Sequence, residues 1–373
     1  MSDNLRRFCA IRQCLNQLYP TRPSGNLARH LTTLASMISG IVGSQSANLP
    51  KIADFVADDT KPESRVKKIY RFLKNDSIDS TDYFLPYAVP LITSLAALNQ
   101  PLLLAIDGSV VGKGCMCLMI SLLYKNRALP LCWQVVKQAK GHMSEALHIE
   151  LFEKVKALIP EDCKVIMLGD GEFDGTDWLA KIETATFKYV CRTAIDSVLI
   201  EDGDVFNFKR LGAGKEGFFA VPEVYFTQKG YGPLQAILWK ESRYQKPVCL
   251  VTNMELAAEA CYWYRKRFHI ETFFSDQKSR GFNIHKSHLE EHERLHRLII
   301  AAALAYIWII YLGCLAMKEK WYQQIHRTDR CDYSLFRMGL KLLNHFLNRS
   351  EKIPVNFIIL AFDDPFKLKS VRD

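Results

Sequence analysis

The sequence predicts an α/β fold: a mixed sheet with a β-rich insertion, a helical N-terminal region and a helical C-terminal tail. Three observations predict it. Short apolar runs bounded by Gly, Asn and Pro fill residues 101–136, helix and strand patterns alternate through residue 193, and only strand patterns occur between residues 194 and 253. Strands followed by alternating helices and strands indicate a mixed sheet with helices packed on it.

The first part of the sheet can be assigned run by run. "PLLLAID", "GCMCLMISLLY" and "ALPLCWQVV" predict three buried strands. A helix with Ser144 as its N-cap is expected over residues 144–160, and a strand over residues 163–170. A second helix, capped by Asp174, and a strand over residues 187–193 complete the pattern.

Five strand-like runs follow between residues 194 and 253. They are "SVLI", "DVFNFKRL", "GFFAVPEVYF", "LQAILWK" and "KPVCLVT", separated by turn sequences. This stretch is typical of a β-rich insertion or a small subdomain. Beyond it, helical patterns continue to about residue 347.

The N-terminal region is basic and helical. Residues 1–75 contain twelve Lys or Arg and five Asp or Glu, so +7 of the net charge of +9 lies there. "KPESRVKKIYRFLKND" predicts a basic amphipathic helix within it. The charge indicates a surface that binds a polyanion, although a solvated basic surface would account for it equally well.

The eleven cysteines indicate the cellular compartment. The chain starts with the polar and basic "MSDNLRRFCAIRQC" instead of an apolar signal segment, so we expect reduced cysteines and a cytoplasmic protein. Their spacing contains no paired C-x-x-C ligand sets, so a zinc site is not expected.

Residues 298–317, "LIIAAALAYIWIIYLGCLAM", are apolar and long enough to cross a membrane. The run stands alone in a chain that otherwise has the composition of a folded soluble protein, and it contains Tyr306, Trp308, Tyr311 and Gly313. We therefore favour a helix buried on all sides over a membrane span.

The segment "YWYRKRFHIETFFSDQK", residues 262–278, combines one glutamate with cations and aromatic rings. On a helix of about 100° per residue, Tyr264, Arg267, Glu271 and Lys278 would share one narrow stripe. Trp263, Ile270 and Phe274 would form an apolar edge beside this stripe. A simple ion pair between Arg267 and Glu271, four residues apart, would explain only two of the four polar residues.

Two aspartates end predicted strands, Asp107 in "LLLAIDGS" and Asp170 in "VIMLGDGEFD". A carboxylate that follows an apolar run needs a cation partner, because burying it alone is costly. Three carboxylates from two strands and a helix suit two hard divalent ions, Mg²⁺ or Mn²⁺, which can act on a phosphodiester. Glu172 and Asp174 compete with Asp170 for the second position, but Asp170 ends the apolar run.

The spacing Y-x2-R-x3-E-x6-K is met in full by Tyr264, Arg267, Glu271 and Lys278. It resembles the signature of bacterial insertion-sequence transposases of the IS-four type, a branch of the DDE transposases with a ribonuclease-H-like core. The resemblance covers most of the chain, from the helical N-terminal region through "AIDGS", "LGDGEFD" and the β-rich insertion to the glutamate helix.

The resemblance implies roles for these residues. Asp107, Asp170 and Glu271 would be the catalytic, metal-binding triad, with two Mg²⁺ ions that Mn²⁺ can replace. Tyr264, Arg267 and Lys278 would contact transposon-end DNA. In relatives an aromatic residue of the β insertion stacks in place of a flipped base, and Trp239 is the candidate here, although a strand tryptophan is more often core. Arg192 is a further candidate for DNA contact, with a surface ion pair as the alternative.

The resulting hypothesis is a metal-dependent transposase that cuts the ends of an insertion sequence and joins them to target DNA, acting as a homodimer without a membrane partner. We expect a DNA-binding region over residues 1–95, a ribonuclease-H-like core over 96–193 and 254–317, the insertion over 194–253 and a tail over 318–373. The alternatives are a ribonuclease-H-like nuclease that does not join DNA and a non-catalytic DNA-binding descendant.

Overall fold

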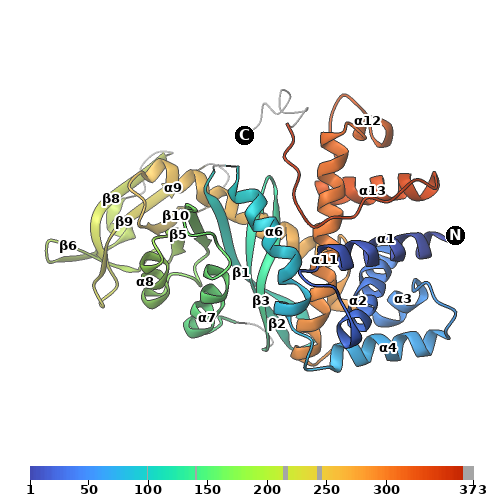
Figure 1. Cartoon of the computed structure of the whole chain (residues 1–373). Helices are drawn as coiled ribbons and strands as arrows, with labels where there is room; N and C mark the ends of the chain where they lie inside the picture. Colours follow the sequence, from blue (N-terminus) through green and yellow to red (C-terminus); the bar gives the residue numbers. More distant parts are fainter. Residues whose placement is uncertain (99, 139–140, 213–216, 242–245, 364–373) are drawn as a thin grey trace.

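The computed structural model describes residues 1–98, 100–138, 141–212, 217–241 and 246–363. One ten-stranded sheet runs through the molecule, with strand order β3-β2-β1-β4-β5-β10-β9-β8-β6-β7. The N-terminal and C-terminal helices gather beside one end of this sheet, and β6 to β9 form the other end (Figure 1).

The first five strands are β1 (Leu102–Gly112), β2 (Cys115–Tyr124), β3 (Arg127–Lys137), β4 (Val165–Gly169) and β5 (Lys188–Thr193). β2 is antiparallel to β1 and β3, whereas β4 is parallel to β1 and to β5. The helices α7 (Glu145–Lys156) and α8 (Thr176–Thr184) lie in the connections that the parallel strands require. The predicted ribonuclease-H-like mixed sheet is confirmed.

The caps of these two helices differ from one another. Ser144 caps α7 as predicted, because its side chain accepts a hydrogen bond from the Leu147 amide. The predicted cap of α8 is wrong. That helix starts after Gly175, and its Trp178 amide donates at 2.8 Å to the carboxylate of Glu145, which belongs to α7.

The strands after β5 are β6 (Val198–Glu201), β7 (Asp204–Asn207), β8 (Gly217–Phe226), β9 (Tyr231–Lys240) and β10 (Val248–Thr252), with the 3₁₀ turn η1 (Phe208–Leu211) after β7. β10 pairs antiparallel with both β5 and β9. The β-rich stretch therefore extends the sheet of the first five strands directly.

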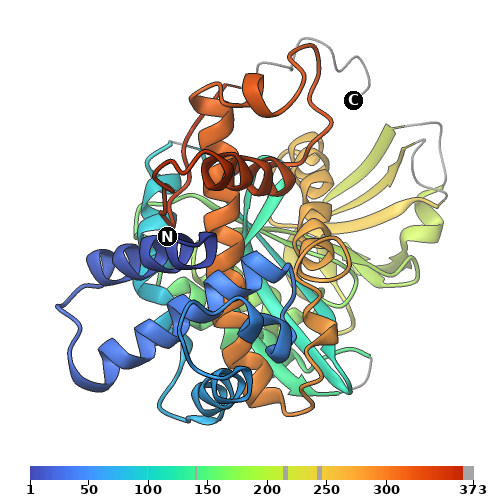
Figure 2. The same ribbon diagram turned by 90° about the vertical axis from the view of Figure 1, so that its right-hand side faces the viewer.

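The N-terminal region consists of α1 (Asp3–Leu18), α2 (Gly25–Ser44), α3 (Leu49–Asp54), α4 (Pro62–Lys74), α5 (Ser80–Tyr83) and α6 (Leu85–Ala96). The C-terminal helices are α12 (Tyr322–Ile325) and α13 (Leu335–Asn348). Both groups pack against α11 (His292–Lys318), which runs through the middle of the view in Figure 2.

Within the described ranges, α11 is the one helix that is long and apolar enough to cross a membrane, but 89% of its apolar window is buried inside the protein. It contacts α2, α4, β3 and α13. The predicted helix buried on all sides is what the structure contains. Close approach to α13 depends on Gly339, where a Cβ atom would lie 1.9 Å from the Ile309 carbonyl oxygen.

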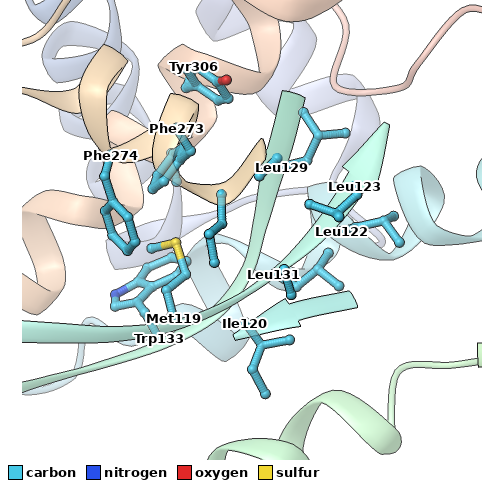
Figure 3. Close-up of a cluster of buried hydrophobic side chains, with 14 of the residues drawn as sticks. Met119, Ile120, Leu122, Leu123, Leu129, Leu131, Trp133, Phe273, Phe274 and Tyr306 are labelled. Atoms are coloured by element: carbon cyan, nitrogen blue, oxygen red, sulfur yellow. The ribbon is translucent and has the colours of Figure 1, made fainter. Parts of the chain in front are cut away.

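The glutamate segment forms α9 (Ala257–Tyr264), the 3₁₀ turn η2 (Arg265–Phe268) and α10 (His269–Gln277), followed by the short turn η3 (Ile284–Lys286). α10 packs on β1, β2 and β3. In Figure 3, Met119 lies on the side of Phe273 and Phe274, while Ile120 points to the opposite face of the sheet. This alternation along β2 fixes which side chains of β1 can face α10.

Candidate active site

Two aspartates lie side by side in the sheet because of strand register. β1 and β4 are parallel, with Ala105 beside Leu168, so two residues further on Asp107 and Asp170 are at equivalent positions. β4 ends at Gly169, directly before Asp170, as predicted. β1 does not end at Asp107, which corrects the prediction, since it continues to Gly112 paired with β2. Asp107 is where the parallel pairing with β4 ends.

The glutamate segment is not the single helix that was predicted, and the difference matters. A 3₁₀ turn rotates each residue by about 120° instead of about 100°, so four residues of η2 add roughly 80°. This rotation brings Tyr264, Arg267, Ile270 and Phe274 onto one face, and all four are buried. Glu271 lies at the edge of that face, with 56% of its side chain exposed. Two residues of the predicted polar stripe, Tyr264 and Arg267, therefore lie on the same buried face as Ile270 and Phe274, which were predicted to form a separate apolar edge.

The three carboxylates converge on one guanidinium. Arg267 Nη1 lies 3.8 Å from Asp107 Oδ2 and 3.9 Å from Asp170 Oδ2, and its Nη2 lies 3.5 Å from Glu271 Oε1. Phe268 and Tyr264 border the same group, with their ring centroids 4.5 and 5.9 Å from Arg267 Cζ. Side chains from β1, the residue after β4 and α10 therefore lie around one guanidinium, and the sharing of metal ions by Asp107, Asp170 and Glu271 stays a prediction.

The three carboxylates around Arg267 carry more negative charge than its guanidinium neutralises. Burial and the neighbouring Asp170 raise the pKa of Asp107 to about 7, although Arg267 acts in the opposite direction. Burial by itself would lower the pKa of Arg267, but Tyr264 and the three carboxylates together raise it. Arg267 thus neutralises only part of the charge of the three carboxylates, so a further cation would be attracted to them.

Lys278 is held beside the triad by a residue that the sequence did not reveal. Its Nζ donates a 2.6 Å hydrogen bond to Ser109 Oγ, two residues after Asp107 on the same strand face. Burial lowers the pKa of Lys278, and Asp107 counteracts this. The signal that would have identified Ser109 is its i+2 spacing from Asp107, once β1 is known to continue.

Glu172 and Asp174, the competing carboxylates, are both engaged elsewhere. Glu172 accepts a hydrogen bond from the Met143 amide at 2.6 Å and lies 3.6 Å from His148 Nε2. Burial opposes its ionisation, but these contacts lower its pKa overall. Asp174 accepts a 2.6 Å hydrogen bond from Thr193 Oγ1. Both residues anchor the loop that follows β4 and so position Asp170.

The remaining residues with implied DNA contacts have different surroundings. Tyr264 is 1% exposed, and burial raises its pKa to about 12. Arg192 on β5 is exposed and close enough to Tyr264 to lower that pKa in part. Trp239 is 3% exposed, and Arg265 lies over its ring at 5.1 Å. Its ring is packed as the core alternative describes, without an open face for a base.

The donor chemistry of the site suits a divalent metal ion. Carboxylate oxygens are the ligands that Mg²⁺ and Mn²⁺ prefer, and three of them already surround a cation here. Among the residues that the structure describes, no three His, Cys, Asp or Glu side chains are yet spaced to hold one ion together. Each of the three carboxylates instead has an oxygen within 4 Å of a terminal nitrogen of Arg267.

The chain is similar to one protein family and to several solved structures. The family described as "Transposase DDE domain" matches residues 100–308. The cryo-EM structure of a piggyBac transposase synaptic complex with hairpin DNA is 11% identical, with a TM-score of 0.45, over 95% of this chain and 82% of that chain.

Endonuclease V from Ciona intestinalis, bound to a 24mer DNA containing an inosine followed by a ribo-adenosine, is 16% identical with a TM-score of 0.29, over 50% of this chain and 87% of that one. Human ENDOV is 15% identical with a TM-score of 0.28, over 51% and 87%. No curated protein matches.

The mixed sheet, with helices between its parallel strands, defines an α/β protein of the ribonuclease-H-like fold. More specifically, the chain belongs to the transposase DDE domain family. It is a DNA transposase, and DDE transposases use divalent metal ions and act on DNA.

Proposed function

We propose that this transposase is of the IS-four type and that Asp107, Asp170 and Glu271 hold two Mg²⁺ ions, which Mn²⁺ can replace. The observation that carries the proposal is the convergence of these three carboxylates on one point at 3.5 to 3.9 Å from a shared cation. Bound there, the ions would activate water or a 3′-hydroxyl and stabilise the leaving oxygen of a phosphodiester.

The protein's own residues bind and orient the DNA. Lys278, tethered to Ser109, presents its charge next to the triad and holds a phosphate near Asp107. Arg192, exposed at the end of β5, offers a planar fork to a neighbouring phosphate. Its position beside Tyr264 extends the track along the edge where β4 and β5 end.

The basic N-terminal region supplies longer-range attraction to the duplex. Lys67, Lys68, Arg71 and Lys74 are exposed on α4, and none of them forms an ion pair with another residue of the described ranges. The segment after Lys278 is hydrogen-bonded to this region, because the Ala47 amide donates to the Phe282 carbonyl oxygen at 2.6 Å. We propose that residues 1–95 bind transposon-end DNA and that two copies act together on two ends, in a bacterial cytoplasm.

The proposal is tested with the DNA ends of its own element. The wild-type protein with Mg²⁺ should nick the ends and join them to a target plasmid, and Glu271→Ala should do neither while still binding the ends. Nicking without joining would favour the nuclease alternative. The metal-dependent mechanism would be contradicted if Glu271→Ala were as active as the wild type. It would also be contradicted if the wild type bound the DNA ends but did not cleave them.

A further inference from the structure

We propose that Arg267 is a built-in counter-cation of the acidic centre: its guanidinium holds the three carboxylates together before metal binds and yields its place when metal arrives. Arg267 is then a positioning residue of the site and not the phosphate contact that its place in the motif implies. The inference rests on the proposed metal site, and it concerns what occupies that site first.

The contacts of Arg267 are shared and long. A charge-assisted N–H···O⁻ hydrogen bond is normally about 2.7–2.9 Å, whereas its three carboxylate contacts measure 3.5, 3.8 and 3.9 Å. Its Nε is buried and has no hydrogen-bond partner among the described residues. A buried guanidinium that served only structure would use its donors fully. This one is held by surrounding charge and by the ring of Phe268, so a small shift breaks no short bond.

The burial of Arg267 also argues against a direct role on DNA. Only 5% of the residue is exposed, so its N–H groups would have to leave the carboxylates to reach a phosphate. Arg192 is exposed, and Lys278 is only partly buried beside the triad. These two residues are better placed to contact DNA, and Arg267 is better placed to neutralise the anions.

The charge balance explains why such a cation is useful. With all three carboxylates ionised, three negative charges face the positive charge of Arg267, and Lys278 adds a second positive charge beside Asp107. Without Arg267, three converging anions would repel one another, and they would attract a divalent ion more strongly. Arg267 therefore stabilises the metal-free site and, by the same interaction, weakens metal binding until DNA contributes its own phosphate oxygens.

The experiment compares the full chain with Arg267→Gln, without DNA, by thermal unfolding in EDTA and by titration with Mn²⁺. The variant should unfold at a lower temperature in EDTA, bind Mn²⁺ about tenfold or more tightly, and show the larger Mn²⁺-induced rise in Tm. Arg267→Lys, which keeps the charge, should stay within about twofold of the wild-type Mn²⁺ affinity.

The double variant Arg267→Gln/Glu271→Gln covers the case in which the single variant does not fold. Removing one anion should restore at least half of the Tm lost in EDTA, since the destabilisation comes from repulsion. Failure of this rescue would overturn the proposal, as would Arg267→Gln with unchanged Mn²⁺ affinity but weaker, less salt-dependent DNA binding. If neither the wild type nor Arg267→Gln binds Mn²⁺, the metal site itself is refuted.

Discussion

Charged side chains are paired differently at the two ends of α10. Before its first turn, Arg267 is shared among three carboxylates at 3.5 to 3.9 Å. In its last turn, Asp276 forms one 2.8 Å ion pair with Arg127 of β3, with 6% and 13% of the two side chains exposed. The matched pair joins helix to sheet, whereas the unmatched cluster keeps surplus negative charge. Charge that nearby residues leave unbalanced is a feature of functional sites, and here it occurs at the candidate site and not at the structural ion pair.

The ion pair at the C-terminal end of α10 should contribute strongly to the stability of the protein. Arg127→Met leaves the Asp276 carboxylate buried without its cation, and we expect the free energy of unfolding at pH 8 to fall by about 3–5 kcal/mol. Urea unfolding measures it. Removal of Arg127 is costly here because it is the one cation within 4 Å of Asp276 among the described residues, and Arg280 attracts the carboxylate only from farther away.

The control is Asp107→Asn, which changes the carboxylate cluster around Arg267, and its unfolding is measured in EDTA. It removes one of three converging anions, so the unfolding free energy should change by less than about 1 kcal/mol, while DNA cleavage with Mg²⁺ should fall by more than about 100-fold. The proposed difference between the ion pair and the carboxylate cluster would be wrong if Asp107→Asn destabilised the protein as strongly as Arg127→Met does. It would also be wrong if Arg127→Met left the stability unchanged.

The stability contributed by Asp276 should depend on pH. Burial raises the pKa of Asp276 from 3.8 to about 6, even though Arg127 and Arg280 oppose the change. The folded protein thus holds this proton more tightly than the unfolded chain. The resulting stabilisation is complete below about pH 4 and is lost as the pH rises to about 6, a loss of roughly 3 kcal/mol.

The measurement is the unfolding free energy of the wild type minus that of Asp276→Asn, from pH 4 to pH 7 in EDTA. The difference should decline over this range, because Asn cannot titrate. Asp107, whose pKa is also raised, is present in both proteins, so its contribution cancels. A constant difference would mean that Asp276 remains ionised throughout.

Local signals in the sequence predicted much of this fold. The Ser144 side chain accepts from the Leu147 amide only three residues away, so this helix start could be predicted from the local sequence. The end of β4 could be predicted in the same way, because the run before Asp170 is apolar to its last residue. The cap of α8 could not, since it comes from Glu145, 33 residues earlier in the chain. The extension of β1 was hidden because "GSVVG" is neither apolar nor regular, and only pairing with β2 makes it a strand.

The candidate site was predictable in its membership but not in its geometry. The spacing of Tyr264, Arg267 and Glu271 is visible in the sequence, yet periodicity assumes one uniform helix. Residues 265–268 form a 3₁₀ turn instead, and the added rotation of roughly 80° buries Arg267. A helical wheel contains no information about such a turn, so the burial of Arg267 could not be predicted from the sequence.

The smallest expected effect concerns Ser109, which tethers Lys278 beside the unmatched charges. Ser109→Ala removes one partly buried hydrogen bond to a cation, so we expect a loss of about 1 kcal/mol in stability and weaker binding of element-end DNA. The matched control is Ser121→Ala on β2, whose buried Oγ has no hydrogen-bond partner among the described residues and should be neutral or stabilising. DNA titrations at several salt concentrations distinguish the two variants. The salt slope should stay unchanged in Ser109→Ala because Lys278 keeps its charge and only loses its fixed position. A slope reduced by a full unit would mean instead that Lys278 no longer reaches the phosphate.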